Sequence, residues 1–466
     1  EGAVSAAFVP VLSEVRETRH ADYSRVFNAL AGIMLLVLTA TTVCGVVFAP
    51  EIVTLYAAGY LDDPPQFQLT VTLTRWVFPY ISLVGLSALV TASLNTLGKF
   101  AVPSLAPIWL NVALIVSALA LPSCLGYWDI PVIFALAIGV LVGGILQVVS
   151  QLPWLHRQKL LGVPSFNARD PAVRKAFKLL VPLLAGLGVY QLNVMGSRLL
   201  ASFLEEGAQS FLYYSQRLVE IPQGMIALAI SSAALPTLAA QRSRGEHQEA
   251  AATLSHALRL CLFLTLPATV FFMAFAYPTV SVLLGRGHFD PVYVEQTARA
   301  LFWQATGIWS IATIRTIVPA FHSHNDTRSP VAGSIVNLVV FIGSALYFMK
   351  SMSHAGIALA ISLAGIAQLG TLLFFLRNHP MKDAFRDMGH SVFKMVVASV
   401  LMACLLLLAA HRIPWANAGN DPWKIAMFVI CSLTACGVYV LSSWLIKSRE
   451  LREFTSVFQR RNTTTP

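Results

Sequence analysis

The chain has 466 residues, of which 56% are hydrophobic and only 12% are charged. Soluble domains average about 45–50% apolar and about 25% charged residues, so this composition excludes an ordinary soluble protein. The formal net charge of +10 would suit nucleic acid, but Lys and Arg fall mostly in short loops between apolar segments, as is usual in membrane proteins. We therefore expect a membrane protein with no nucleic-acid partner.

Apolar runs of bilayer-spanning length, about 20 residues, recur along the whole chain. They predict an all-α polytopic membrane protein and exclude a β-barrel, whose strands would show shorter segments of alternating polarity. Thirteen spans are predicted, the first of them partial, near residues 1–13, 27–50, 70–95, 103–122, 131–153, 176–203, 208–240, 254–284, 296–321, 330–349, 355–376, 391–411 and 424–446.

Two matching stretches indicate an internal repeat. "AVSAAFVPVLSEVR" (Ala3–Arg16) and "AISSAALPTLAAQR" (Ala229–Arg242) share six identical positions at a constant separation of 226, and Pro103 recurs as Pro330 at nearly the same separation. Because the matched spans run in the same direction, this is a parallel repeat about an axis along the membrane normal. The repeat predicts two six-helix lobes followed by two extra C-terminal helices.

The repeat also predicts domain limits. The N-lobe covers 1–165, the C-lobe covers 166–385, and 386–466 holds the two extra helices and a tail. Residues 170–226, about 57 in number, precede the second copy and have no counterpart before the first. We therefore expect the N-lobe to lack its first span and part of its second, with fourteen spans in the full protein.

Loop charges predict the orientation of the chain. The segments "AAGYLDDPPQFQ" and "LEEGAQ" contain no Lys or Arg, whereas the alternate loops are basic. Basic loops face the cytoplasm by the positive-inside rule, which places the C-terminus there.

Charged residues within the apolar segments mark candidate functional positions, because charge at membrane depth is costly. In "YYSQRLVEIPQG", Arg217 and Glu220 stand three residues apart and share one helix face. Pro222 and Gly224 follow and predict a hinge. Arg315, in "SIATIRTIVPAF", lies inside another span. The alternatives are a structural ion pair that locks two helices for the first pair, and snorkelling toward the headgroups for Arg315.

The embedded arginines outnumber the embedded carboxylates, which are Glu220 and Glu1. Guanidinium groups bind phosphate in bidentate fashion, so the balance favours a phosphate or pyrophosphate ligand. The sequence contains no P-loop, dinucleotide turn, metal helix or nucleophile elbow. The six cysteines are scattered and indicate neither a disulfide framework nor a zinc site. We expect no cofactor and no metal, and a transporter driven by the membrane potential or an ion gradient.

Three stretches carry a family resemblance: "EGAVSAAFVPVLSE", "FPYISLVGLSALVTASLNTLGKFAVPSLAP" and "LYYSQRLVEIPQGMIALAISSAALPTLA". They resemble the MviN/MurJ family of lipid II flippases, within the multidrug/oligosaccharidyl-lipid/polysaccharide exporter superfamily. The resemblance implies fourteen spans and a central cationic cavity that opens alternately to the two sides of the bacterial inner membrane. It also implies that lipid II, an undecaprenyl-pyrophosphate-linked peptidoglycan precursor, moves from the cytoplasmic to the periplasmic leaflet.

The resemblance assigns roles to individual residues. Arg217 matches the functional arginine of the family's eighth span, and Glu220 follows it in the same motif. Arg315 stands where relatives carry a basic residue, and Glu1 matches an acidic position at the start of the second-span motif.

Two other transporters remain open as alternatives. One is a flippase for another undecaprenyl-linked glycan of the O-antigen type. The other is a cation-coupled multidrug exporter, which would have twelve spans and buried acids. A membrane enzyme would need an acid–base pair at the membrane surface, and Glu220 is the sole candidate, so we expect a transporter and not an enzyme.

Overall fold

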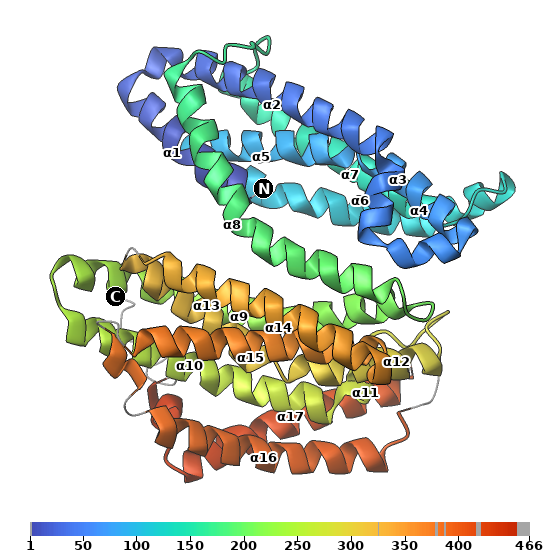
Figure 1. Ribbon diagram of the computed structural model, residues 1–466, viewed down its shortest axis with the longest axis vertical. Helices are drawn as coiled ribbons and strands as arrows, with labels where there is room; N and C mark the ends of the chain where they lie inside the picture. Colours follow the sequence, from blue (N-terminus) through green and yellow to red (C-terminus); the bar gives the residue numbers. More distant parts are fainter. Residues whose placement is uncertain (1, 325, 378–380, 386–387, 416–420, 454–466) are drawn as a thin grey trace. The chain divides into compact units, whose positions relative to one another are not determined.

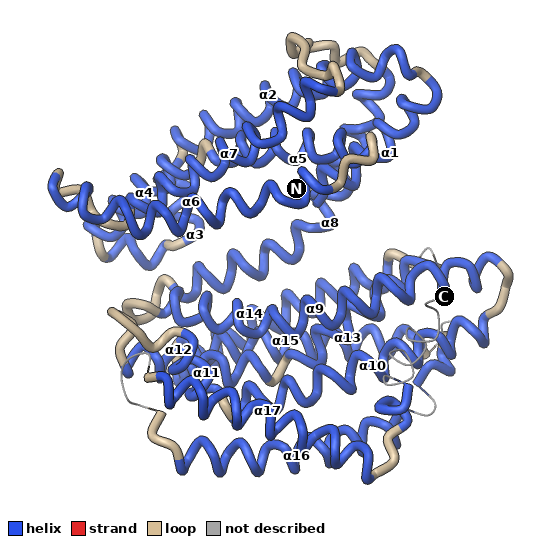
Figure 2. The backbone as a smooth tube through the Cα atoms, turned by 180° about the vertical axis from the view of Figure 1, so that it is seen from behind, coloured by secondary structure: helices blue, strands red, loops and turns tan. Residues whose placement is uncertain are grey.

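The computed structural model describes residues 2–324, 326–377, 381–385, 388–415 and 421–453. Across these ranges every regular element is a helix and no strand is present (Figures 1 and 2). The predicted all-α fold class is confirmed. The chain divides into two compact units, Glu1–Gln191 and Leu192–Pro466.

The first unit contains seven α-helices, two short 3₁₀ turns and the first part of α8. Their bounds are α1 (Gly2–Thr18), η1 (His20–Asp22), α2 (Tyr23–Val47), α3 (Ala49–Tyr56), η2 (Ala58–Asp62), α4 (Pro64–Val77), α5 (Tyr80–Thr96), α6 (Ala101–Tyr127), α7 (Phe134–Arg157) and α8 (Pro171–Ala201).

The second unit begins within α8 and contains nine further α-helices. Their bounds are α9 (Ala208–Ser243), α10 (His247–Ala274), α11 (Ala276–Leu283), α12 (Pro291–Ala305), α13 (Ile308–Ser323), α14 (Arg328–Met352), α15 (His354–Leu376), η3 (Lys382–Phe385), α16 (Met388–Arg412) and α17 (Pro422–Leu445).

In the described part of the chain, ten helices are long and apolar enough to cross a membrane. They coincide with ten of the thirteen predicted spans. The other three predicted spans, near 1–13, 176–203 and 296–321, are also helical: they contain α1, α8, and the pair α12 and α13. That these three also cross the bilayer stays a prediction.

Two of the long apolar segments are broken at equivalent places. The helix axis is interrupted at Phe48, between α2 and α3, and at Phe275, between α10 and α11. A proline follows each break, Pro50 and Pro278. Each proline lies in the first turn of the helix that follows the break, where its missing backbone N–H would have no partner in any case. The predicted span 254–284 is two helices, α10 and α11, and the predicted span 70–95 likewise contains two, α4 and α5.

The helices after these breaks begin in the same way in both units. Asp63 caps α4 and accepts from the backbone N–H of Gln66, while Asp290 caps α12 and accepts from Val292 and Tyr293. Each Asp is followed by Pro, which suits the first helical turn because its missing N–H would have no partner there.

A matching pair of long-range contacts supports the repeat. The Arg16 guanidinium on α1 donates to the carbonyl of Thr96 at the end of α5. In the second unit, the Arg242 guanidinium on α9 donates to the carbonyl of Ser323 at the end of α13. The two donors are 226 positions apart and the two acceptors 227 apart, the separations at which the sequence stretches match.

The two C-terminal helices belong to the second unit. α16 packs against α10 and α17, with Met395 and Met402 buried in the same apolar core as Leu258. The hydroxyl of Tyr439 on α17 donates to the carbonyl of Phe263 on α10 at 2.7 Å. The apolar outer surfaces of α16 and α17 remain exposed, as expected for helices that face lipid.

Candidate functional site

The candidate site lies on α9, the longest helix of the second unit. α9 begins after Gly207, whose φ of +89° is a left-handed conformation that glycine adopts without strain. It then continues to Ser243 through Pro222 and Pro236 without interruption. The segment that the sequence singled out therefore forms one helix, which fixes the relative faces of its side chains.

Arg217 and Glu220 form an ion pair on this helix. Arg217 Nη1 and Glu220 Oε2 are 2.9 Å apart, and the side chains are 61% and 32% exposed. Because the two residues belong to one helix, this contact does not join two helices. Exposed pairs at this spacing stabilise a helix by only about 0.2–0.5 kcal/mol. The pair keeps a positive and a negative group accessible at one position along α9.

Three neighbours that the sequence analysis did not identify hold this pair in place. The guanidinium of Arg217 lies over the ring of Tyr213, 5.0 Å from its centre. The Gln216 amide donates to the second oxygen of Glu220 at 3.4 Å, and the Gln304 amide of α12 donates to Gln216 at 2.9 Å. Tyr213 stands four residues before Arg217, a spacing that could have indicated the contact. Nothing local in the sequence points to Gln304.

Arg315 on α13 lies close to the same face of α9. A Cβ atom added at Gly224 would be 3.9 Å from Arg315 Nη1, and the hydroxyl of Ser231 donates to the backbone carbonyl of Arg315 at 3.0 Å. Gly224 is seven residues after Arg217, so both lie on one side of α9, about 10 Å apart along its axis. Arg217 therefore projects from one face of α9, and Arg315 of α13 lies next to the same face.

The remaining predicted site residues have different positions. Pro222 is buried, on a different side of α9 from the exposed Arg217. Gly224 has room for a methyl group, so space alone does not require glycine there. A hinge at these two residues stays a prediction. Glu1 lies outside the described residues.

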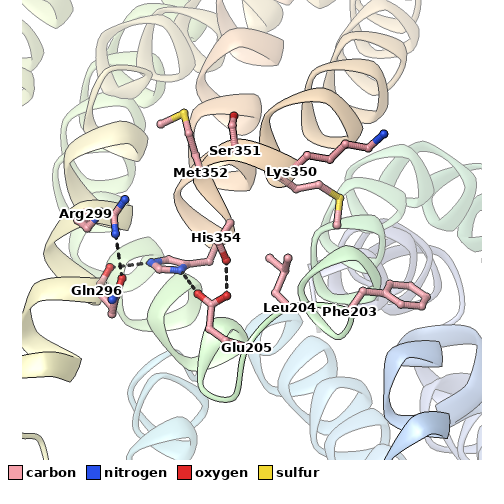
Figure 3. A pocket seen from close by; sticks show the side chains of 11 residues that line it. Phe203, Leu204, Glu205, Gln296, Arg299, Lys350, Ser351, Met352 and His354 are labelled. Carbon is pink, nitrogen blue, oxygen red and sulfur yellow. Dashed lines mark hydrogen bonds and ion pairs between the residues drawn. The ribbon is translucent and has the colours of Figure 1, made fainter.

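A second polar cluster surrounds the loop between α8 and α9 (Figure 3). His354, the first residue of α15, is 1% exposed; its Nδ1 is 2.8 Å from Glu205 Oε1 and its Nε2 is 2.9 Å from the carbonyl of Gln296. A carboxylate and a carbonyl only accept hydrogen bonds, so a doubly protonated imidazole satisfies both contacts. Ser353, at a strained φ of +53°, also donates to Glu205.

The electrostatics of Glu205 follow from these contacts. Partial burial alone would raise the pKa of its carboxyl group, but the hydrogen bonds from Ser353 and His354 outweigh burial and lower the pKa. The cluster lines a cavity of about 500 Å³ together with Arg299 and Lys350. Glu205 thus ties the loop that precedes α9 to the turn between α14 and α15.

Among the residues that the structure describes, no three His, Cys, Asp or Glu side chains come together as a metal site would require. The cysteines in these ranges are free thiols. Near α9 the described chain places two guanidinium groups and one carboxylate, and guanidinium groups bind anions such as phosphates.

Comparison with known proteins places this chain in a family. A model of the lipid II flippase MurJ family matches residues 1–420. This chain belongs to the lipid II flippase MurJ family. A probable lipid II flippase MurJ of Vibrio cholerae is 34% identical over 415 residues, covering 87% of this chain and 78% of the relative. The lipid II flippase MurJ of Burkholderia cenocepacia is 31% identical over 454 residues, covering 96% and 87%.

Solved structures of other proteins show the same fold. A lipid II flippase MurJ in an inward closed conformation matches with a TM-score of 0.76 at 23% identity, over 96% of this chain and 88% of that one. An inward-facing multidrug transporter of the MATE family matches with a TM-score of 0.64 at 15% identity, over 83% and 88%. The family resemblance stated from the sequence is confirmed, and this MurJ-family chain is a multi-pass protein of a transporter family.

Proposed function

We propose that this chain moves lipid II from the cytoplasmic to the periplasmic leaflet of the bacterial inner membrane by alternating access, without covalent chemistry. Membership of the lipid II flippase MurJ family supports the substrate class. The observation that carries the proposal is the pair of arginines beside one face of α9, where Arg217 and Arg315 are both exposed within apolar segments.

The proposed role of Arg217 is to bind the pyrophosphate. Its guanidinium presents donors in a planar fork that matches phosphate oxygens. Glu220 holds Arg217 when no substrate is bound, and the pyrophosphate replaces that carboxylate on binding. Arg315 supplies a second positive charge about two helical turns away. We assign the acidic position at Glu1 the same kind of role toward a basic partner, and Pro222 with Gly224 the role of a hinge.

The proposed orientation puts the basic loops and the C-terminus in the cytoplasm, by the positive-inside rule. The proposed domains are those of the repeat, 1–165, 166–385 and 386–466.

Energy comes from the membrane potential or an ion gradient, since one charge that crosses 100 mV gains about 2.3 kcal/mol. Lipid II and membrane lipids are the partners, with no cofactor.

Complementation tests the substrate. The chain is expressed in bacteria depleted of their own lipid II flippase, with Arg217→Ala in parallel and membrane insertion checked for both. Growth with the wild type but not with Arg217→Ala supports both the substrate and the role of Arg217. Failure of inserted wild-type protein would favour a flippase for another undecaprenyl-linked glycan, and rescue by both would leave Arg217 without the proposed role.

A further inference from the structure

A basic cavity lies at one end of the C-terminal helix pair, away from α9. Its volume is about 490 Å³, and it is bordered by Arg259 of α10, His390 and Lys394 of α16, and Arg449 and Glu450, which follow α17. All of these residues belong to the second unit. None has a part in the proposed transport site.

Arg259 is the unusual member of this group. It is only 8% exposed, and its Nε atom is buried without a hydrogen-bond partner. The structure records no ion pair to Arg259 in the described part of the chain. Burial of a positive charge without a partner is strongly unfavourable, and proteins normally compensate it with an anion and hydrogen bonds. Arg259 therefore marks a place where an anion is expected.

The neighbouring charges leave the cavity positive. Lys394 donates only to the backbone carbonyl of Lys447, at 3.4 Å, and Arg449 is paired with Glu453 at 2.8 Å.

One acid faces the cavity. Glu450 is 1% exposed, with one oxygen accepting from Ser448 at 2.7 Å and the other without a hydrogen bond. Burial alone would raise the pKa of this carboxyl group, but the neighbouring hydroxyls of Ser391 and Ser448 and the positive charge of Arg259 together lower it. One carboxylate therefore faces two cations, Arg259 and Lys394, that form no ion pair in the described chain.

The cavity also lies at the boundary of the apolar segments. Lys394 is the last charged residue before the long apolar run of α16, and Lys447 is the first after α17. Next to Lys394, Phe393 is 66% exposed, which offers apolar surface for a hydrocarbon chain. Basic pockets between transmembrane helices at this level bind the headgroups of anionic lipids.

We propose that this cavity binds the phosphate of an anionic phospholipid headgroup, with Arg259 and Lys394 as its main ligands. The acyl chains extend along the exposed apolar surface of α16. The buried guanidinium, whose Nε has no hydrogen-bond partner in the described chain, and the exposed phenylalanine together favour a lipid phosphate over a free anion. This site is separate from the transport of lipid II and does not depend on it.

The test uses the full chain in nanodiscs of phosphatidylcholine with increasing fractions of phosphatidylglycerol, and follows the thermal unfolding midpoint. The wild-type midpoint rises and saturates with phosphatidylglycerol, as for any ligand of the folded state. For Arg259→Met we expect a half-saturating fraction at least tenfold higher.

Lys394→Gln should raise the half-saturating fraction about fivefold, as expected for one basic residue at the membrane surface. Arg412→Gln, an exposed position at the other end of α16, is the matched control and should leave it unchanged. The proposal is overturned if Arg259→Met or Lys394→Gln responds to phosphatidylglycerol like the wild type. Millimolar inorganic phosphate or glycerol 3-phosphate that reproduces the full rise would overturn the lipid as the source of the phosphate.

Discussion

The ion pair on α9 allows stability and transport to be separated by one substitution, Arg217→Ala. The structure limits what the substitution can cost in folding free energy. An exposed pair at this spacing contributes about 0.2–0.5 kcal/mol, and the contact with Tyr213, also exposed, about 0.5–1 kcal/mol. The total is about 1 kcal/mol, and the expected fall in the thermal midpoint is about 2 °C or less for a chain of this length.

Transport should respond far more strongly. A hydrogen bond to a charged group contributes about 1.5–3 kcal/mol, so loss of the Arg217–pyrophosphate contact should reduce the rate about 10- to 100-fold. The assay is the appearance of lipid II in the opposite leaflet of proteoliposomes, with the thermal midpoint measured on the same preparations. Arg217→Lys keeps the charge but loses the bidentate geometry, and should fall between wild type and Arg217→Ala.

Lys175→Ala is a suitable control, because Lys175 forms a comparably exposed ion pair with Glu14. It should show a similarly small change in stability and normal transport. A large loss of stability in Arg217→Ala with a proportional loss of transport would refute the assignment, since Arg217 would then act through the fold. Unchanged transport in Arg217→Ala would refute it as well.

Three further predictions follow from the second unit. Gln304→Leu should reduce transport several-fold by removing the hydrogen bond to Gln216 and so loosening its contact with Glu220, and Gln304→Asn, which keeps an amide donor, should retain more of the rate in the proteoliposome assay. Glu205 has a lowered pKa, so its stabilisation is complete above its ordinary value of 4.5 and is lost as the pH falls through the lower folded-state pKa. Glu205→Gln should therefore lower the free energy of unfolding near neutral pH by about 1 kcal/mol or less for this partly exposed group, and its difference in thermal midpoint from the wild type should vanish in strong acid. Gly224→Ala fits without a clash and should raise stability by about 0.5–1 kcal/mol, while a hinge at this position would show as slower transport in the same preparations.

The sequence was sufficient for the fold class because helix formation in a membrane depends on local composition. Apolar runs of about 20 residues are visible in one chain, and backbone groups in lipid must be satisfied within each helix. The internal repeat was also visible in the sequence, because the matching residues keep a constant separation. The structure shows why Arg16 and Arg242 recur, since each makes the same contact in its own unit. The breaks at Phe48 and Phe275 were missed because the apolar run continues through them and only Pro50 and Pro278 signal the change.

Contacts within the site could be predicted only between residues that share a helix. Arg217 and Glu220 stand three apart, so their pairing follows from helix geometry. Gln304 and Arg315 reach the same region from α12 and α13, and no spacing in the sequence connects them to α9. Contacts between distant segments depend on how helices pack, which a single sequence without related sequences does not disclose.

The network around Glu220 connects the site to the break between α12 and α13. Gln304 lies two residues before the break at Thr306–Gly307 and is buried, and its amide donates to Gln216. A substrate that draws Arg217 away from Glu220 would change the charge that surrounds Glu220, and with it the strength of the hydrogen bonds that link Glu220 to Gln216 and Gln304. A buried amide loses stabilisation when it loses its hydrogen-bond partners. We therefore expect movement of α12 to be coupled to the binding of substrate at Arg217. The coupling would appear as a non-additive effect on transport in a double-mutant cycle of Gln304→Leu and Arg217→Lys, and additive effects would show that the break moves independently of the ion pair.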